Sequence, residues 1–135
     1  AKNADEASRI LSRIKVLIRT NYSNPPAHGS AIISTILGDG DLRMLWEEDL
    51  KAMRTRIREI RNEFVNGLSR AGVPGDFSFI RDQKGMFSFS GLSPEQVRQL
   101  REDHAIYIVD SGRINVAGLN PGNLERVCGA VAAVS

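Results

Sequence analysis

Residues 41–70, DLRMLWEEDLKAMRTRIREIRNEFVNGLSR, carry the longest regular pattern in the sequence. Apolar side chains recur in it at steps of three and four residues, namely Trp46, Leu50, Met53, Ile57, Ile60, Phe64 and Leu68. That period is typical of an α-helix with one apolar face. We therefore predict one helix over residues 42–70 with Asp41 as its N-cap, about 40 Å long. A helix of this length can be part of two neighbouring domains.

Four arginines of this stretch raise the alternative of nucleic-acid binding: they are Arg54, Arg56, Arg58 and Arg61. At 100° per residue they spread around the polar side of the helix, among several glutamates. No aromatic side chains interleave with them to stack on bases. We interpret them as a solvated helix surface laced with ion pairs, and we predict no nucleic-acid partner.

On the N-terminal side of the long helix, two shorter helices are expected. Apolar residues at helical spacing predict the first over residues 5–18. The Asn24-Pro25-Pro26 stretch then interrupts the helix, because proline restricts both itself and the residue before it. Residues 31–37 predict a short buried helix, which ends at Gly38-Asp39-Gly40.

On the C-terminal side the pattern changes to a period of two. Residues 77–79 and 87–89 both alternate phenylalanine with serine, which predicts an antiparallel hairpin. The β-branched runs 106–109 and 114–116 predict a second strand pair.

Helices are expected between and after these strands. Ser93-Pro94-Glu95-Gln96 has the form of a capping box that opens a helix reaching about His104, and Asn120-Pro121 opens a last helix. The order of elements predicts an α+β fold in which helices pack on a mainly antiparallel sheet.

Composition narrows the class of protein. The 135 residues amount to about one domain, and 18 basic against 16 acidic side chains give a net charge of only +2. The single cysteine, Cys128, lies on an apolar helix face, so we expect a buried, inert thiol and no disulfide. His28 and His104 lie far apart in the sequence and lack the neighbouring ligand residues that would indicate a metal site. No apolar run approaches the roughly 20 residues that span a bilayer. We expect a cytoplasmic protein without a membrane partner.

The segment Ser111-Gly112-Arg113-Ile114-Asn115-Val116-Ala117-Gly118 carries the strongest functional signal. It places a guanidinium beside a glycine, between two apolar runs that read as strands. Arginine offers a rigid fork of parallel N–H donors that matches the two oxygens of a carboxylate. We therefore expect Arg113 to bind a carboxylate in a cavity that another region of polypeptide completes.

This segment and two earlier blocks, residues 22–29 (YSNPPAHG) and 85–92 (GMFSFSGL), together resemble a known family. In order and spacing they are similar to the C-terminal part of class I pyridoxal-phosphate-dependent aminotransferases, of the aspartate and aromatic amino acid type. The resemblance implies that residues 1–40 are the end of the large domain or an interface segment. Residues 41–135 would then be the small C-terminal domain of the fold-type I enzymes, entered by the long connecting helix.

The resemblance also implies roles for individual residues. Arg113 would bind the α-carboxylate of an amino acid or 2-oxo acid substrate, and Arg19 would reach from the neighbouring subunit of a homodimer to the distal carboxylate of aspartate or glutamate. Phe87 would close over the substrate, and Ser23 would lie near the cofactor phosphate across the dimer interface. Three alternatives stay open: Arg113 as a plain surface arginine in a turn, Arg19 as a plain cation at a helix C-terminus, and Phe87 as a core residue.

Catalysis in this family needs a Schiff-base lysine for pyridoxal 5'-phosphate, which the large domain mainly binds. The four lysines of the sequence are Lys2, Lys15, Lys51 and Lys84, and none stands in the context of that lysine. We therefore expect no catalytic residue in this chain and no activity from these residues alone. The alternative is a non-catalytic domain that acts as a binding or assembly module.

Overall fold

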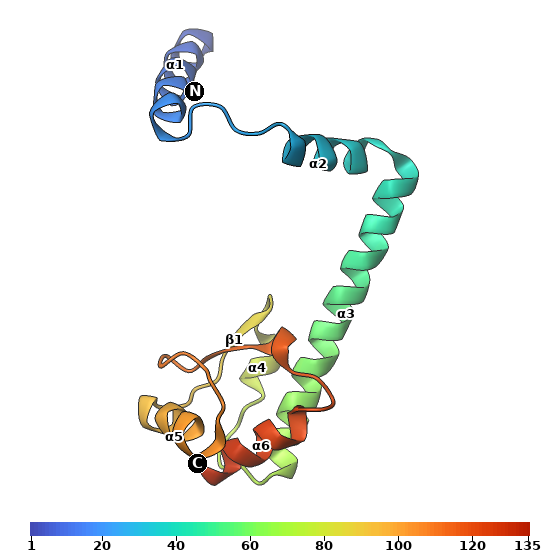
Figure 1. Cartoon of the computed structure of the whole chain (residues 1–135), viewed down its shortest axis with the longest axis vertical. Helices are drawn as coiled ribbons and strands as arrows, with labels where there is room; N and C mark the ends of the chain where they lie inside the picture. Colours follow the sequence, from blue (N-terminus) through green and yellow to red (C-terminus); the bar gives the residue numbers. More distant parts are fainter. The chain divides into compact units, whose positions relative to one another are not determined.

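The computed structural model describes all 135 residues, most of them in helices. They divide into two compact units, Ala1–Glu47 and Glu48–Ser135. The division falls inside one continuous helix, α3, which Figure 1 shows as a single uninterrupted ribbon. None of the helices is both long enough and apolar enough to cross a membrane. The prediction that residues 1–40 and 41–135 belong to different domains of a larger enzyme stays a prediction.

The first unit contains helix α1 (Ala4–Asn21), helix α2 (His28–Gly38) and the beginning of α3. The side chain of Asn3 caps α1 by accepting a 2.8 Å hydrogen bond from the backbone N–H of Glu6. The prolines lie between α1 and α2, as predicted. The prediction of a buried helix over residues 31–37 is right about the helix but wrong about its burial. None of the residues of α2 is buried: Ile36 is half-buried, and the other large apolar side chains, Ile32, Ile33 and Leu37, are exposed.

Helix α3 (Gly40–Arg70) confirms the predicted long helix, although its cap differs from the prediction. The carboxylate of Asp39 accepts hydrogen bonds of 3.0 Å from the backbone N–H groups of both Asp41 and Leu42. Asp39 is the capping residue because its backbone is still extended, whereas Asp41 already lies inside the helix.

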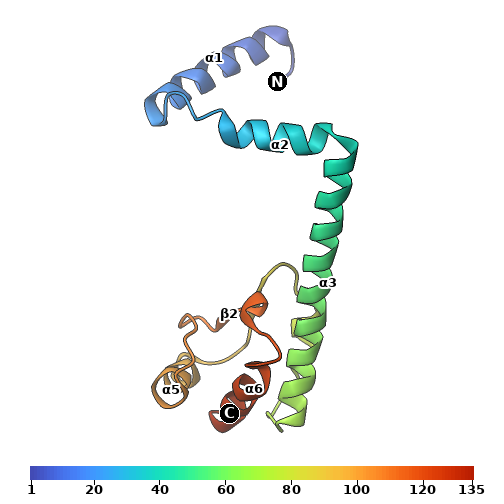
Figure 2. The same ribbon diagram turned by 45° about the vertical axis from the view of Figure 1, so that its right-hand side comes forward.

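The core of the second unit forms where the C-terminal half of α3 meets helix α6 (Leu124–Ala133), which lies beside it in Figures 1 and 2. A Cβ atom added to Gly67 of α3 would lie 2.6 Å from Cys128 Sγ of α6. Only glycine permits this close approach. The burial of Cys128 confirms the expected buried thiol.

The sheet has only two strands, β1 (Phe87–Phe89) and β2 (Arg113–Asn115), which pair antiparallel. The prediction that residues 77–79 pair with residues 87–89 is wrong, because Phe79 begins a short helix, α4 (Phe79–Asp82). Asp76 accepts hydrogen bonds of 2.8 Å from both the backbone N–H and the hydroxyl of Ser78. This local turn starts the helix where the phenylalanine pattern predicted a strand.

The predicted strand over residues 106–109 is also absent. Ala105 takes a left-handed conformation, with φ of 50°, and the next residue, Ile106, donates a hydrogen bond back to the carbonyl of Leu100. The segment leaves the helix by this turn and packs Ile106 and Ile108 against the core. The fold is therefore mostly helical, with a smaller antiparallel sheet than the sequence predicted.

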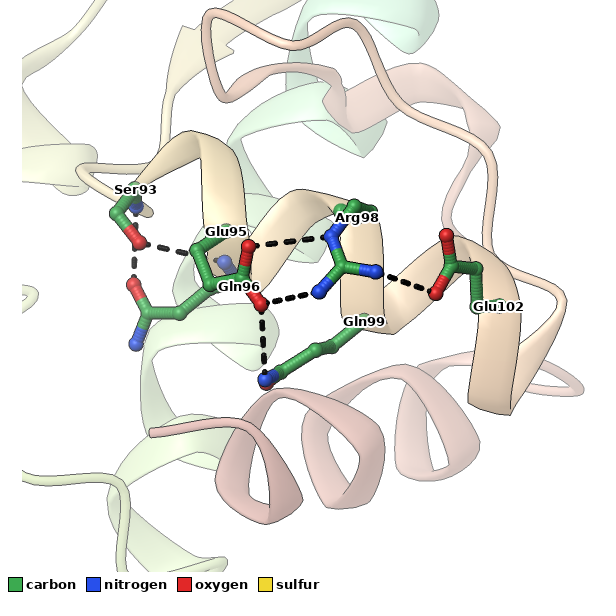
Figure 3. A network of polar contacts seen from close by, with 6 residues as sticks. All are labelled: Ser93, Glu95, Gln96, Arg98, Gln99 and Glu102. Carbon is green, nitrogen blue, oxygen red and sulfur yellow. Dashed lines mark hydrogen bonds and ion pairs between the residues drawn. The ribbon is translucent and has the colours of Figure 1, made fainter.

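Helix α5 (Pro94–His104) confirms the predicted capping box, which Figure 3 shows in detail. Ser93 Oγ accepts from the backbone N–H of Gln96 at 3.2 Å, and Gln96 Oε1 accepts from the backbone N–H of Ser93 at 2.9 Å. Along the same helix, Arg98 donates to Glu95 and Glu102. The hydrogen bonds from Arg98 lower the pKa of Glu95 below its usual range.

The 3-10 turn η1 (Val116–Gly118) and a loop join β2 to α6, which begins later than predicted. The backbone N–H of Asn120 donates to Asn123 Oδ1 at 2.8 Å, and the N–H of Leu124 donates to the Asn120 carbonyl at 3.0 Å. Residues 120–123 thus form a turn before the helix instead of its first turn.

Candidate functional site

Arg113 is the first residue of β2, and its side chain is exposed. The central carbon of its guanidinium lies 4.8 Å from the centroid of the Phe87 ring, in the geometry of a cation–π contact. It forms no ion pair with any carboxylate of the chain. The fork of donors is therefore positioned by an aromatic face and free to bind an external carboxylate.

The backbone in front of Arg113 is held rigidly. Both the backbone N–H and the buried hydroxyl of Ser90 donate to the carbonyl of Gly112, at 3.0 and 2.6 Å. Gly112 has φ of 74°, and an added Cβ would lie 3.0 Å from the carbonyl oxygen of Leu92. Glycine is thus required next to Arg113 by both conformation and space. The charged side chain projects from a turn that needs little reorganisation.

Phe87 leaves 47% of its surface exposed and contacts Arg113 rather than the apolar core. The alternative that Phe87 is a core residue does not hold within this chain. Its ring is available to a molecule that binds at the guanidinium.

Arg19 and Ser23 lie together in the other unit, at the C-terminal end of α1. Both line an open hollow of about 700 Å³, together with Lys15 and Asn24. Ser23 is in the left-handed region, with φ of 61°, and its backbone N–H donates to the carbonyl of Ile18 at 2.9 Å. Two cations and three serine hydroxyls line the hollow, beside apolar side chains, and the cations suit an anion. Arg19 has no ion-pair partner in the chain.

The structure thus brings the four residues singled out by the sequence together in two pairs. Arg113 lies with Phe87, and Arg19 lies with Ser23. The roles assigned to the four residues stay predictions.

Arg61 is a polar residue whose role the sequence interpretation missed. Its side chain is 5% exposed, and the guanidinium donates to the carbonyls of Gln83 and Gly85. The interpretation of Arg61 as part of a solvated surface is therefore wrong. Its position is the signal that identifies it, since it lies four residues after Ile57 and three before Phe64, inside the apolar stripe.

Arg56, from the same group of arginines, also departs from that interpretation. Its guanidinium donates to the carbonyl of Leu119 at 3.1 Å, and at longer distances to that of Ala117. Arg56 thus ties α3 to the loop that follows β2.

The remaining reactive side chains are the lysines and the cysteine. All four lysines, Lys2, Lys15, Lys51 and Lys84, are exposed. Cys128 is buried, and burial raises the pKa of its thiol. No group of three or more His, Cys, Asp or Glu side chains is arranged to hold a metal ion.

Comparison with known proteins places this geometry in context. Residues 3–131 match the family described as "Aminotransferase class I and II". The aspartate aminotransferase of Escherichia coli (strain K12) is 51% identical over 99% of this chain, and the match covers 34% of that relative. An aromatic-amino-acid aminotransferase of Pseudomonas aeruginosa is 44% identical, again over 99% of this chain and 34% of the relative.

Solved structures agree with the sequence comparison. The mitochondrial aspartate aminotransferase of Trypanosoma brucei, as a K237A mutant, superposes with a TM-score of 0.93 at 42% identity, covering 100% of this chain and 36% of that one. The aromatic-amino-acid aminotransferase of Burkholderia pseudomallei, covalently bound to pyridoxal phosphate, gives 0.91 at 55% identity, covering 96% and 33%. The chain therefore spans about a third of the length of the relatives that it matches.

Proposed function

Because this chain belongs to the class I and II aminotransferase family, we propose that it is the C-terminal part of an aspartate or aromatic amino acid aminotransferase. The enzyme would exchange amino and keto groups between an amino acid and a 2-oxo acid. Residues 1–40 would end the large domain, and residues 41–135 would form the small domain entered by α3. The order of the three sequence blocks supports this placement, and the names of the relatives support the substrate classes.

The observation that carries the proposal is the unpaired guanidinium of Arg113 on a fixed strand. A planar fork of two N–H donors binds a carboxylate through two parallel, charge-assisted hydrogen bonds. Arg113 would hold the α-carboxylate of the substrate in this way, and so fix the direction of the Cα–H bond. Phe87, stacked on the guanidinium, would cover one side of the substrate and exclude water from it.

Arg19 supports a preference for dicarboxylic substrates. Its charge is unpaired and lies on a concave surface with Lys15, which favours the binding of a second carboxylate. We propose that Arg19 binds the distal carboxylate of aspartate, glutamate or their 2-oxo acids, from the neighbouring subunit of a homodimer. The sequence resemblance supports the dimer, and we propose that the enzyme works in the cytoplasm.

Pyridoxal 5'-phosphate is the cofactor expected of this family, and when bound it supplies an electron sink for the bonds at the substrate Cα. The residues of this chain suit the phosphate end of the cofactor but not the end that a lysine would bind covalently. A lysine that binds the cofactor covalently needs an enclosed pocket, whereas all four lysines here are exposed and Lys15 lines only an open hollow. The Ser23 hydroxyl, in a basic hollow, suits the phosphate end. We propose that the rest of the enzyme holds the cofactor and that Ser23 contributes across the dimer interface.

Two variants of the full-length enzyme test the assignment of the arginines. Arg113→Ala is expected to lower kcat/KM about 10- to 100-fold for both aspartate and phenylalanine, the scale of a lost charged hydrogen bond. Arg19→Ala is expected to cause a similar loss for aspartate and to leave phenylalanine within about threefold. Arg13→Ala, an exposed cation on the same helix, serves as the control. Equal losses for both amino acids in Arg19→Ala, or none in Arg113→Ala, would refute the assignment.

A further inference from the structure

The outer edge of β1 is closed by a side chain instead of a third strand. Ser90 N–H and the Met86 carbonyl bond to residues on either side of β2. Because the polar groups of an antiparallel strand alternate in direction, those of Phe89 point away from β2. Both are bound by Gln83, whose Nε2 donates to the Phe89 carbonyl at 3.1 Å while its Oε1 accepts from the Phe89 N–H at 2.8 Å. The amide of Gln83 thus takes the place of a neighbouring strand.

Gln83 is itself held from the core. The buried guanidinium of Arg61 donates to the backbone carbonyl of Gln83 and, at 2.6 Å, to that of Gly85. Arg61 projects from α3 within the apolar stripe, so the turn between α4 and β1 is attached to the helix whose C-terminal half contributes to the core.

The residue that Gln83 holds is the direct cross-strand partner of Arg113. The register of the sheet pairs Phe89 with Arg113, and the residue after Phe89, Ser90, binds the carbonyl before Arg113. Hydrogen bonds therefore link Arg61 to Gln83 and Gln83 to Phe89, and the next residue along the chain, Ser90, is hydrogen-bonded to the carbonyl that precedes Arg113.

We propose that Gln83, anchored by Arg61, is a positioning residue for Arg113, an inference that rests on the proposed function of Arg113 as the α-carboxylate ligand. Phe89 is 55% exposed, so water can satisfy its backbone groups if the amide is removed. Loss of Gln83 then costs little folding free energy. Its main effect is to loosen the β1–β2 pair, so that the guanidinium of Arg113 is no longer held in one position. Small displacements of a binding group weaken binding strongly.

A double-mutant cycle in the full-length enzyme tests the proposal, with steady-state kinetics on aspartate and phenylalanine and thermal melting for each variant. Gln83→Met is expected to raise KM about five- to tenfold for both amino acids, mainly in KM rather than in kcat. In the Arg113→Ala background the same change is expected to alter kcat/KM by less than about twofold, because the fork it positions is gone. Gln83→Glu keeps an acceptor for the Phe89 N–H but sets a carboxylate oxygen against the Phe89 carbonyl, so its effect should be at least as large as that of Gln83→Met.

Gln99→Met is the matched control, because Gln99 donates only to an exposed glutamate on α5. Its kinetics should equal those of the wild type. The proposal is overturned if Gln83→Met has the same effect with and without Arg113, or if it lowers the melting temperature while KM stays unchanged. If Gln83→Met does not fold, the cycle with Gln83→Glu decides by the same criteria. If Arg113→Ala itself leaves KM unchanged, the proposed function fails first. If Arg113→Ala raises KM but Gln83→Met leaves it unchanged, only the proposed positioning role of Gln83 fails.

Discussion

Gly67→Ala should destabilise the protein, although the same change in a helix interior normally stabilises it. The added Cβ would lie 2.6 Å from Cys128 Sγ, whereas ordinary contacts of a Cβ begin near 3.4 Å. Overpacking of this kind costs about 1–3 kcal/mol. Replacing glycine by alanine in a helix gains about 0.5–1 kcal/mol. The difference between the midpoints of these two ranges is a net loss of about 1 kcal/mol.

Removal of the sulfur atom of Cys128 should make Gly67→Ala stabilising instead of destabilising. In a Cys128→Ala background the nearest remaining side-chain atom is the Cβ at position 128, 3.6 Å away, which is an ordinary contact. There Gly67→Ala should stabilise by about 0.5–1 kcal/mol. Gly129→Ala is the control, since Gly129 is also helical and an added Cβ meets nothing within 4 Å. It should stabilise in both backgrounds.

Thermal melting of the four combinations of Gly67 and Cys128 variants in the full-length enzyme gives the comparison. Hydrogen exchange of the amides of α3 and α6 shows whether the change is local. Stabilisation by Gly67→Ala in both backgrounds would refute the reasoning, because it would mean that the two helices do not approach as closely as described.

Three further outcomes are expected. Arg61→Met should cost about 1–3 kcal/mol in urea unfolding, because it leaves two carbonyls of the turn before β1 without their donor; a loss no greater than for the exposed Arg58→Met would contradict this. Arg98→Ala should destabilise the protein fully at pH 7, and this loss should vanish as the pH falls through the pKa of Glu95, which is lowered below its ordinary value of 4.5. The loss should also shrink in 1 M salt. Urea unfolding at several pH values measures it. Cys128 should react with a disulfide reagent at pH 8 at least about tenfold more slowly in the native than in the unfolded protein, because burial raises its pKa and shields the thiol; equal rates would contradict its burial.

Local signals in the sequence were sufficient where the structure depends on local contacts. The capping box of α5 was predictable because Ser93 and Gln96 bond within a single turn. The extent of α3 followed from the period of its apolar residues. The cap of α3 was displaced by two residues, from Asp41 to Asp39, since both aspartates precede the stripe and only the backbone conformation distinguishes them.

Strand pairing was not predictable in the same way, because it depends on residues far apart in sequence. The alternating phenylalanines predict a strand at residues 77–79, yet the turn formed by Asp76 and Ser78 starts a helix there. Strand β1 instead finds its partner at residues 113–115.

The candidate site shows the same difference between local contacts and contacts distant in sequence. Arg113 was singled out from its glycine neighbour and from two apolar runs that were read as strands, of which only the second forms one. The contact of Gln83 with Phe89 has no counterpart in sequence spacing. Arg61 was misread because a charged residue was judged by its type. Its angular position within the apolar stripe of α3 points to burial.

The most direct test of the central claim compares two ligands that differ only in the group that Arg113 would bind. Phenylalanine carries an α-carboxylate, and 2-phenylethylamine is the same molecule without it. In the full-length enzyme, Arg113→Ala should weaken the binding of phenylalanine about 10- to 100-fold and leave that of 2-phenylethylamine within about twofold. An equal loss for both ligands, or no loss for phenylalanine, would contradict the account of Arg113 as the carboxylate ligand.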